Sequence, residues 1–364
     1  MSWRWRSKES ACCAIMWRDT LIRLFPALAG LGPHCYVVGG AVRDLILGNR
    51  PVDVDVACPD PLAAAQSIGK KAIRLGDQEH LSAYRVVLGE HVYDFAAILD
   101  GDIDVDLARR DFTVNAMAID LAADALLDPH GGQRDIEARI VRMVKASNFD
   151  DDPLRMLKGV RMAVKYGFTL DPATLEAIRT RAPRILDVAA ERVIYELSII
   201  FSFGRLRKAI DLLRRTGLAE PLALQLRDVH ANDVSLAGSY ALLVDDPRAF
   251  AERWRWSESL LREVLTLKSL VEHHDRIALY DAGEAIARQL PALLAALGDD
   301  DALDFPDFSI RSLLTGNEIA AVTGLPPGKE LGRIKRALLE AQIRGEVKTR
   351  EEAERVAVTL ASSV

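Results

Sequence analysis

The chain has 364 residues, 49% of them hydrophobic and 27% charged, which is enough for two or three globular domains with buried cores. Its net charge of -6 argues against nonspecific coating of nucleic acid, although a local basic face is compatible with it. No apolar run reaches the roughly 18 residues that span a bilayer, and Cys12, Cys13, Cys35 and Cys58 form neither a C-x-x-C pair nor a zinc-spaced cluster, so we expect a cytoplasmic protein with reduced thiols.

The first part of the chain predicts a small sheet with helices between its strands. Residues 1–30 are interpreted as an N-terminal extension, because the short apolar stretch near the start runs directly into charged residues. From 31 to 146 short apolar runs alternate with turns, which predicts a domain that we call the head. Its strands are predicted at 35–40 and 52–57, in a hairpin at 84–98 around Gly89–Glu90 and in a pair at 116–132, with helices at 41–48 and 61–72.

After Asp150 the pattern changes to apolar residues at spacings of three and four, which is typical of helices. We divide this part into neck helices (147–204), a helical body (205–300) and a helical tail (301–364). The predicted fold class is therefore α+β, with a mixed-sheet head followed by all-α neck, body and tail domains. Proline steps predict helix joints at 171–172, 182–183, 246–247 and 325–328, and the acidic stretch 298–307 predicts a loop.

The strongest chemical signal is a glycine turn, a helical stretch and two aspartates in VVGGAVRDLILGNRPVDVDVA. Asp53 and Asp55 are two apart on a predicted strand, so both carboxylates face one side. Such a pair suits Mg²⁺, and two such ions can activate an attacking hydroxyl and stabilise leaving pyrophosphate. Gly39 and Gly40 let the backbone approach a triphosphate, and Arg43 adds a charged fork. A lone D-x-D is more often a solvated strand edge, but the upstream GGAVRD sets this pair apart.

The pattern G-G-x-V-R-D followed by G-x-x-x-x-D-x-D resembles the class II tRNA nucleotidyltransferase and bacterial poly(A) polymerase family of the polymerase-β-like superfamily. The resemblance covers nearly the whole chain beyond about residue 30, and it implies transfer of nucleotides to an RNA 3′ end without a template. Further matching segments are LARRDFTVNAMAID (107–120), the end of the head (126–144), DDPLRMLKGVRMAVKYGF (151–168), the neck element AERVIYEL (190–197) and the helical tail (324–353).

The R-R-D-F-T-x-N-A element supplies three candidate nucleotide-binding residues. Arg110 can bind triphosphate oxygens with two donors, Asp111 can accept from a ribose hydroxyl, and Asn115 can brace the loop. An isolated Arg-Arg-Asp would instead be a surface ion cluster of little energetic consequence.

A polar stripe is predicted where Asp152, Arg155, Lys158 and Arg161 recur every three residues on a helix. The resemblance implies that Asp152 and Arg155 read the Watson–Crick edge of the incoming base, in place of a template. Lys158 stands where the family commonly has arginine and lacks the planar fork. The alternative is an ion pair on a solvated helix face.

Two positions keep two interpretations each. Arg192 either holds the base-reading helix in place or pairs with Glu196 four residues later. Asp94 is either a third metal-binding carboxylate or one half of a cross-strand ion pair.

Other segments yield weaker expectations. His273–His274–Asp275 lacks the further histidine and aspartate that a metal phosphohydrolase needs. The basic tail segment 332–350 is interpreted as an RNA contact, with a membrane-surface helix or a solvated helix as alternatives, and 179–184 and 204–215 are further RNA-contact candidates.

The stretch ILDGDIDVDLA before Arg109 is short and acidic, where many members of the family carry a longer basic loop. The resemblance implies that this loop switches the base pocket from C to A, so its shortening resembles enzymes that add only two C residues. We expect addition of C, A or both from CTP and ATP to tRNA with Mg²⁺ as cofactor, and no stable protein partner. The alternatives are an A-adding enzyme or poly(A) polymerase, a nucleotidyltransferase for small molecules or proteins, and an inactive RNA-binding protein of the same fold.

Overall fold

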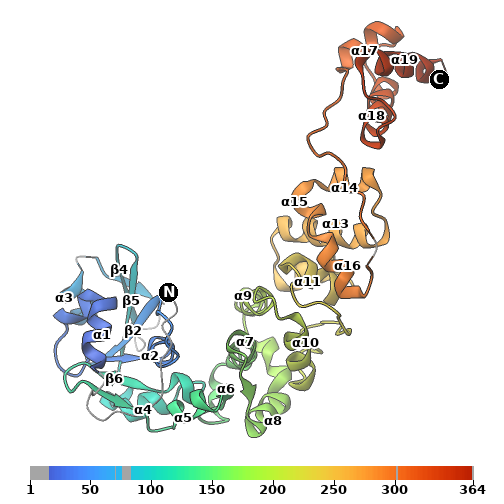
Figure 1. Ribbon diagram of the computed structural model, residues 1–364. Coiled ribbons are helices and arrows are strands. Elements are labelled where there is room, and N and C mark those ends of the chain that lie inside the picture. The colour runs from blue at the N-terminus through green and yellow to red at the C-terminus, as the bar shows by residue number, and fades with distance from the viewer. Residues whose placement is uncertain (1–15, 70, 76–82, 301, 363–364) are drawn as a thin grey trace, which may run out of the picture. The chain divides into compact units, whose positions relative to one another are not determined.

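The computed structural model describes residues 16–69, 71–75, 83–300 and 302–362 (Figure 1). It contains two compact units: Met1–Ile200 with Leu212–Leu222, and Phe201–Asp211 with Ala223–Val364. Cys12 and Cys13, and with them the first half of the predicted extension, lie outside the described residues. Cys35 and Cys58 are free and buried, in agreement with the expected reduced thiols.

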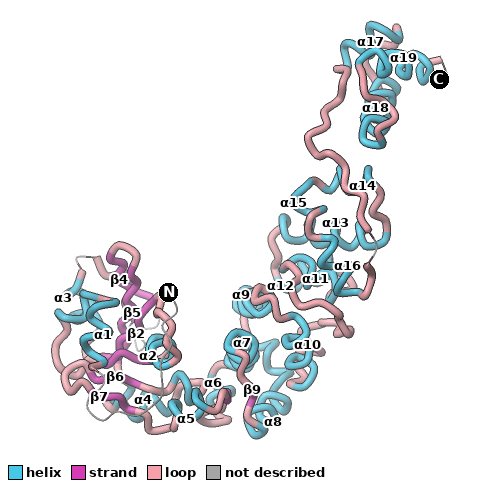
Figure 2. The backbone as a smooth tube through the Cα atoms, viewed as in Figure 1, coloured by secondary structure: helices cyan, strands magenta, loops and turns pink. Residues whose placement is uncertain are grey.

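The first unit is built on a seven-stranded mixed sheet in the order β3-β4-β5-β2-β1-β6-β7 (magenta in Figure 2). β2 pairs with β5 in parallel and with β1 antiparallel, so the strand that carries the two aspartates lies in the middle of the sheet. The predicted strands and the hairpin at Gly89–Glu90 are confirmed. The strands are β1 (Tyr36–Val38), β2 (Asp53–Cys58), β3 (Ile73–Leu75), β4 (Ala83–Leu88), β5 (His91–Ala97), β6 (Ala118–Asp120) and β7 (Ala125–Leu127).

One strand of this sheet was not predicted. The helix expected over 61–72 ends at Ile68, and β3 follows after a short connection. Gly69 is the reason for the early end: a methyl group added there would lie 2.4 Å from Cγ1 of Val86. Glycine thus lets the chain pass close to β4, where a helix could not continue.

The helices of the first unit cover the sheet and then continue beyond it. Trp17–Leu24 is helical, and Phe25 after it packs its ring edge-on against His91 and Tyr93 of β5, so the described end of the extension belongs to the core. The helices that begin in this unit are α1 (Trp17–Leu24), α2 (Gly40–Ile46), α3 (Pro61–Ile68), α4 (Ile103–Ala108), α5 (Gly132–Glu137), α6 (Asn148–Asp151), α7 (Arg155–Tyr166), α8 (Pro172–Arg181) and α9 (Ala190–Phe201).

The predicted helix that was to carry the polar stripe begins later than expected. Asp152 is extended, with φ -144° and ψ 93°, and α7 starts only at Arg155. Pro153 explains the break, because its ring disfavours the helical conformation of the residue before it. A two-residue strand pair, β8 (Ile140–Val141) with β9 (Thr169–Leu170), is a further departure from the all-helical expectation.

The described residues of the second unit form helices joined by loops. The joints predicted at Asp246–Pro247 and at 325–328 are confirmed, and the described part of 298–307 is a loop. No helix in the described part of the chain is long and apolar enough to cross a membrane. The helices that begin in this unit are α10 (Leu206–Arg215), α11 (Leu236–Leu243), α12 (Pro247–Trp254), α13 (Glu258–Glu272), α14 (Arg276–Ala282), α15 (Glu284–Ala287), α16 (Leu290–Leu297), α17 (Gly316–Thr323), α18 (Lys329–Arg344) and α19 (Arg350–Ala361).

Candidate active site

Asp53 and Asp55 face the same side of β2, while Val54 and Val56 between and after them are buried at 0% and 1% exposure. Asp55 keeps part of its surface exposed and lines a polar cavity, where surrounding protein atoms limit its hydration. This partial desolvation raises the pKa of Asp55 to about 6; Asp53 and Asp94 raise it further, while Arg110 and Arg85 lower it. A cation bound here would therefore offset the repulsion that Asp55 experiences from Asp53 and Asp94.

A polar cavity of about 430 Å³ opens beside Asp55 within the first unit. It gathers residues from the glycine turn, from β2, from the R-R-D element and from the start of α7. All ten predicted nucleotide-binding residues line it, whereas Asp53 and Asp94 are not among its lining residues. Arg109 lines it too and was missed, although it is the first arginine of the R-R-D element. The lining residues are Gly39, Gly40, Arg43, Asp55, Arg109, Arg110, Asp111, Asn115, Asp152, Arg155, Lys158 and Arg161.

The glycine turn is required by conformation and by space. Gly39 has φ 74° and ψ -131°, which residues with a side chain rarely adopt. A methyl group added there would lie 3.0 Å from Nη1 of Arg110 and 3.6 Å from Oδ2 of Asp55. Both side chains therefore reach the same glycine, and a larger residue would push them apart.

Arg43 is held by a network that crosses the first unit. Its Nη1 donates to Oδ1 of Asn115 at 2.6 Å, its Nε and Nη2 donate to Asp44 at 3.0 Å, and its guanidinium lies 4.9 Å over the ring of Tyr166. Asn115 in turn donates to Oδ1 of Asp111 at 3.0 Å, which agrees with its expected bracing role. The network holds Arg43 and Asp111 at the cavity wall before any ligand arrives.

Asp152, one of the two predicted base-reading residues, is bonded to an arginine that lies far away in the sequence. Arg192 donates to both oxygens of Asp152, at 3.3 and 3.1 Å, and Nζ of Lys158 lies 4.0 Å from the same carboxylate. Glu196 instead accepts from Nη1 of Arg161 at 3.1 Å. Arg192 thus binds Asp152, a residue predicted to read the base, while Glu196 is bonded to Arg161, which agrees with the bracing interpretation of Arg192.

Asp94 takes part in a cross-strand ion pair, one of its two interpretations. Arg85 of β4 donates from Nε and Nη2 to its two oxygens, at 2.7 and 2.6 Å. Asp94 also lies opposite Asp55 in the parallel β2–β5 register, so it adds negative potential at that aspartate. Among the described residues, no cluster of three His, Cys, Asp or Glu side chains could hold a metal ion. Asp53 and Asp55 stay the predicted pair of Mg²⁺ ligands, because carboxylate oxygens are ligands that this ion prefers.

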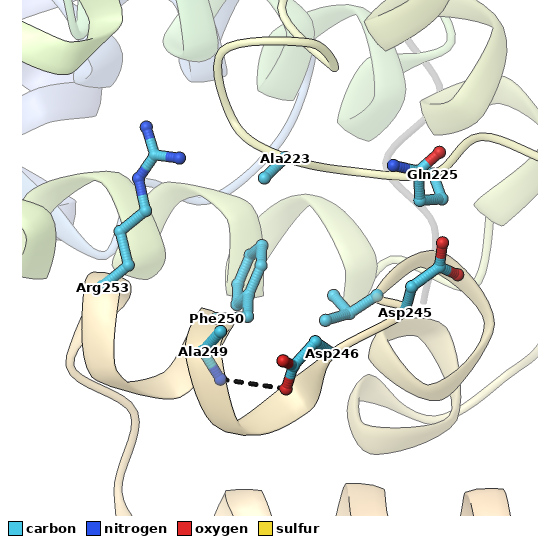
Figure 3. Close-up of a pocket in the computed structure, with 8 residues that line it drawn as sticks. Ala223, Gln225, Asp245, Asp246, Ala249, Phe250 and Arg253 are labelled. Carbon is cyan, nitrogen blue, oxygen red and sulfur yellow. Dashed lines mark hydrogen bonds between the residues drawn. The ribbon is translucent and has the colours of Figure 1, made fainter.

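A second cavity of about 270 Å³ lies in the second unit, between the chain at Ala223 and α12 (Figure 3). Its carboxylates serve the local structure. Asp246 accepts from the backbone N–H of Ala249 at 3.1 Å, as the N-cap of α12, and Asp245 pairs with Arg227 at 3.4 Å. We therefore assign this cavity no chemistry. Likewise, Asp275 of the His-His-Asp segment caps α14 and belongs to no metal cluster of the described residues.

The RNA-contact candidates carry many internal ion pairs. In α18, Arg336 bonds to Asp281 and Glu340, and Arg333 bonds to Glu330. Glu330 and Asp281 are exposed, and Glu340 is partly buried. In the segment 179–184, Arg181 and Arg184 both bond to Asp150. An RNA phosphate would therefore have to compete with these carboxylates.

Comparison with known proteins identifies relatives over most of the chain. The "Poly A polymerase head domain" matches residues 35–99 and 71–142, and the "Probable RNA and SrmB- binding site of polymerase A" matches 167–229. An A-adding tRNA nucleotidyltransferase of Deinococcus radiodurans is 31% identical, covering 92% of this chain and 97% of that protein. A CC-adding tRNA nucleotidyltransferase of Geobacter sulfurreducens is 29% identical, covering 90% and 93%. A crystal structure of the Bacillus stearothermophilus CCA-adding enzyme in complex with CTP superimposes with a TM-score of 0.73 at 25% identity, over 96% of this chain and 98% of that one.

Proposed function

The chain belongs to the tRNA nucleotidyltransferase family, and from this premise we propose that it adds C, A or both from CTP and ATP to the 3′ end of tRNA. The single observation that carries the proposal is the 430 Å³ cavity, because it gathers arginines, a glycine turn and acceptor–donor side chains beside Asp55. These are the groups that a nucleoside triphosphate needs.

The proposed reaction is in-line attack of the RNA 3′-hydroxyl on the α-phosphate, with pyrophosphate as the leaving group. Asp53 and Asp55 would hold Mg²⁺, which when bound supplies charge neutralisation and lowers the pKa of the attacking hydroxyl. Arg43 and Arg110 face the cavity with fixed guanidiniums and would bind the phosphate oxygens. Asp111 would accept from the ribose. Most of the acceleration then comes from positioning and electrostatics.

Base choice would rest on Asp152 and Arg155 at the other side of the cavity. Cytosine and adenine both present an exocyclic amine donor beside a ring-nitrogen acceptor, whereas uracil and guanine present the reverse. A carboxylate next to a guanidinium complements the first pattern and opposes the second. Arg192 holds the Asp152 carboxylate by two hydrogen bonds, so the acceptor does not rotate freely.

The product of the reaction separates two candidate functions. The segment before Arg109 is short and forms a 3-10 turn (Leu99–Gly101) and α4, which favours CC addition. The A-adding enzyme of Deinococcus radiodurans, similar over nearly the full length of both proteins, supports A addition as the second candidate, and the CC-adding enzyme of Geobacter sulfurreducens, similar to nearly the same extent, supports CC addition.

One assay tests the proposal and separates the candidates. Purified protein is given tRNA that ends before CCA, after C, or after CC, with labelled CTP or ATP. Two C residues on the first substrate identify a CC-adding enzyme, one A on the last an A-adding enzyme, and a long A ladder a poly(A) polymerase. If no RNA incorporates either nucleotide, the proposed function is wrong.

A further inference from the structure

Asp106 is a buried carboxylate at the edge of the cavity to which the proposed function gives no task. Its side chain is 1% exposed, yet it binds two arginines at once. Oδ1 accepts from Nε and Nη2 of Arg109, at 3.0 and 2.7 Å, and Oδ2 accepts from Nη2 of Arg110 at 3.0 Å. Each carboxylate oxygen of Asp106 therefore accepts hydrogen bonds from a different arginine.

The local sequence makes this arrangement rigid. Asp102 caps α4 by accepting from the backbone N–H of Asp104 at 2.8 Å, and Leu107 is fully buried against Val38 and Ala118 of the sheet. Arginines three and four residues after Asp106 lie on its side of the helix end, which is the spacing that such ion pairs need. The Asp106 carboxylate is thus held in place by a helix that packs on the core of the first unit.

Arg110 lies between two carboxylates. Its Nη2 bonds to Asp106, while its Nη1 approaches the glycine turn to within 3.0 Å of the position of a methyl group on Gly39. Oδ2 of Asp55 lies 3.6 Å from that same position, so the guanidinium has a second carboxylate within reach. Its Nε is buried and has no hydrogen-bond partner among the described residues.

The two arginines keep the Asp106 carboxyl ionised, which is the form that accepts their hydrogen bonds. Burial opposes ionisation of Asp106, but Arg110 and Arg109 outweigh it and hold the pKa of its carboxyl below the usual value. The negative charge of Asp106 therefore attracts Arg110 in competition with Asp55. If Arg110 closed onto Asp55, it would occupy the oxygens that are proposed to bind Mg²⁺.

We propose that Asp106 is a positioning residue for the nucleotide, which holds Arg109 and Arg110 through separate oxygens so that both guanidiniums face the triphosphate and Arg110 stays off Asp55. The inference rests on the proposed function, because it needs a triphosphate in this cavity. It adds Arg109 to the phosphate-binding set. A purely structural task for Asp106, fastening α4 to the loop after it, would affect folding and leave nucleotide affinity unchanged.

The test compares Asp106→Asn, Asp106→Glu and the matched control Asp104→Asn, an exposed aspartate of the same helix turn. Binding of CTP and of ATP to the full chain is measured by titration calorimetry in EDTA, without RNA, and kcat and KM for the incorporated nucleotide are measured with Mg²⁺ and tRNA. Asp106→Asn turns an amide N–H₂ toward one guanidinium, so the nucleotide Kd and KM should rise by about ten- to a hundredfold, the range for a lost hydrogen bond to a charged group. Asp104→Asn should match the unchanged protein in both measurements.

Asp106→Glu keeps the charge and shifts both arginines by one methylene. It therefore covers the case in which Asp106→Asn does not fold, and it should raise KM more than it lowers kcat. Unchanged nucleotide Kd and KM in a folded Asp106→Glu or Asp106→Asn variant would overturn the inference, even if the melting temperature fell. Failure of the proposed function itself is distinguished by the unchanged protein, which would then bind neither nucleotide and transfer none.

Discussion

Arginine–carboxylate pairs occur in both units of the chain, but they differ in burial. Two carboxylates that pair with cavity arginines of the first unit are hidden, with Asp106 at 1% and Glu196 at 4% side-chain exposure, although Asp150 of the same unit is 42% exposed. In the second unit Glu330 is 39% and Asp281 is 45% exposed.

This difference in burial determines whether an ion pair holds its arginine in one place or exchanges partners. A buried carboxylate is costly unless it is paired, so it holds its arginine in one place. An exposed pair contributes about 0–1 kcal/mol and exchanges partners easily. Arginines at the cavity are therefore positioned in advance, whereas those of α18 can exchange a carboxylate for a phosphate at small cost.

The largest effect is expected at Asp53, which forms no ion pair with an arginine of the described residues and is proposed to bind the cation. Asp53→Ala should lower nucleotide transfer by roughly a thousandfold or more, because a proposed ligand of Mg²⁺ is lost. The melting temperature should hardly change, since Asp53 is exposed. Asp281→Ala is the matched control in the second unit and should keep the rate within about twofold. A normal transfer rate in Asp53→Ala would refute the metal assignment.

The contrast between buried and exposed pairs is tested by Arg161→Ala against Arg333→Ala. Removal of Arg161 leaves Glu196 buried without its cation, which should cost about 3 kcal/mol in the free energy of unfolding of the first unit. Removal of Arg333 breaks an exposed pair with Glu330 and should cost less than about 0.5 kcal/mol. Scanning calorimetry of the full chain measures both changes in the free energy of unfolding. Equal losses in the two variants would contradict the distinction between buried and exposed pairs.

A glycine from each unit allows the two units to be compared in backbone conformation as well. Gly39→Ala should destabilise by about 1–2 kcal/mol and raise the nucleotide KM, because the residue has φ 74° and its methyl group would crowd Arg110. Gly332 lies inside α18 with nothing within 4 Å of an added methyl group. Gly332→Ala should therefore stabilise by up to about 1 kcal/mol. Thermal unfolding of both variants checks the two signs, and a stabilised Gly39→Ala would contradict the strain.

The smallest effect is a pH dependence at Asp55. Burial raises its pKa to about 6, above the value of about 3.9 in an unfolded chain. The folded state therefore binds the proton more tightly, so the free energy of unfolding falls as the pH rises from about 4 to about 6, and the same ionisation prepares the site for a cation. We expect the Mg²⁺ concentration for half-maximal rate to rise about fivefold from pH 6 to pH 5, as the ionised fraction of Asp55 falls, and to change little from pH 7 to pH 8.

Asp55→Asn provides the control for this pH effect. It should abolish transfer and yet raise the melting temperature near neutral pH, because it removes a charge that the fold disfavours. A lower melting temperature in this variant would show that the raised pKa is not the cause.

Several features of the site were predictable because they depend on neighbours in the sequence. Asp53 and Asp55 share a strand face, Gly39 ends a strand at a turn, and proline steps begin α8 and α12. Alternation, glycine conformation and missing N–H groups act within a few residues, so a single sequence reveals them.

The partners of the charged side chains were decided by the tertiary structure. Arg192 was equally able to pair with Glu196 on its own helix, yet it binds Asp152, 40 residues earlier. Asp94 could have faced a metal, yet Arg85 on the adjacent strand binds both of its oxygens. An ion pair forms where packing brings two groups within about 4 Å, and sequence spacing does not determine that distance between separate elements. The sequence by itself therefore determined which types of side chain are available for the cavity. The packing of β2, α4, α7 and α9 decided which arginine pairs with which carboxylate.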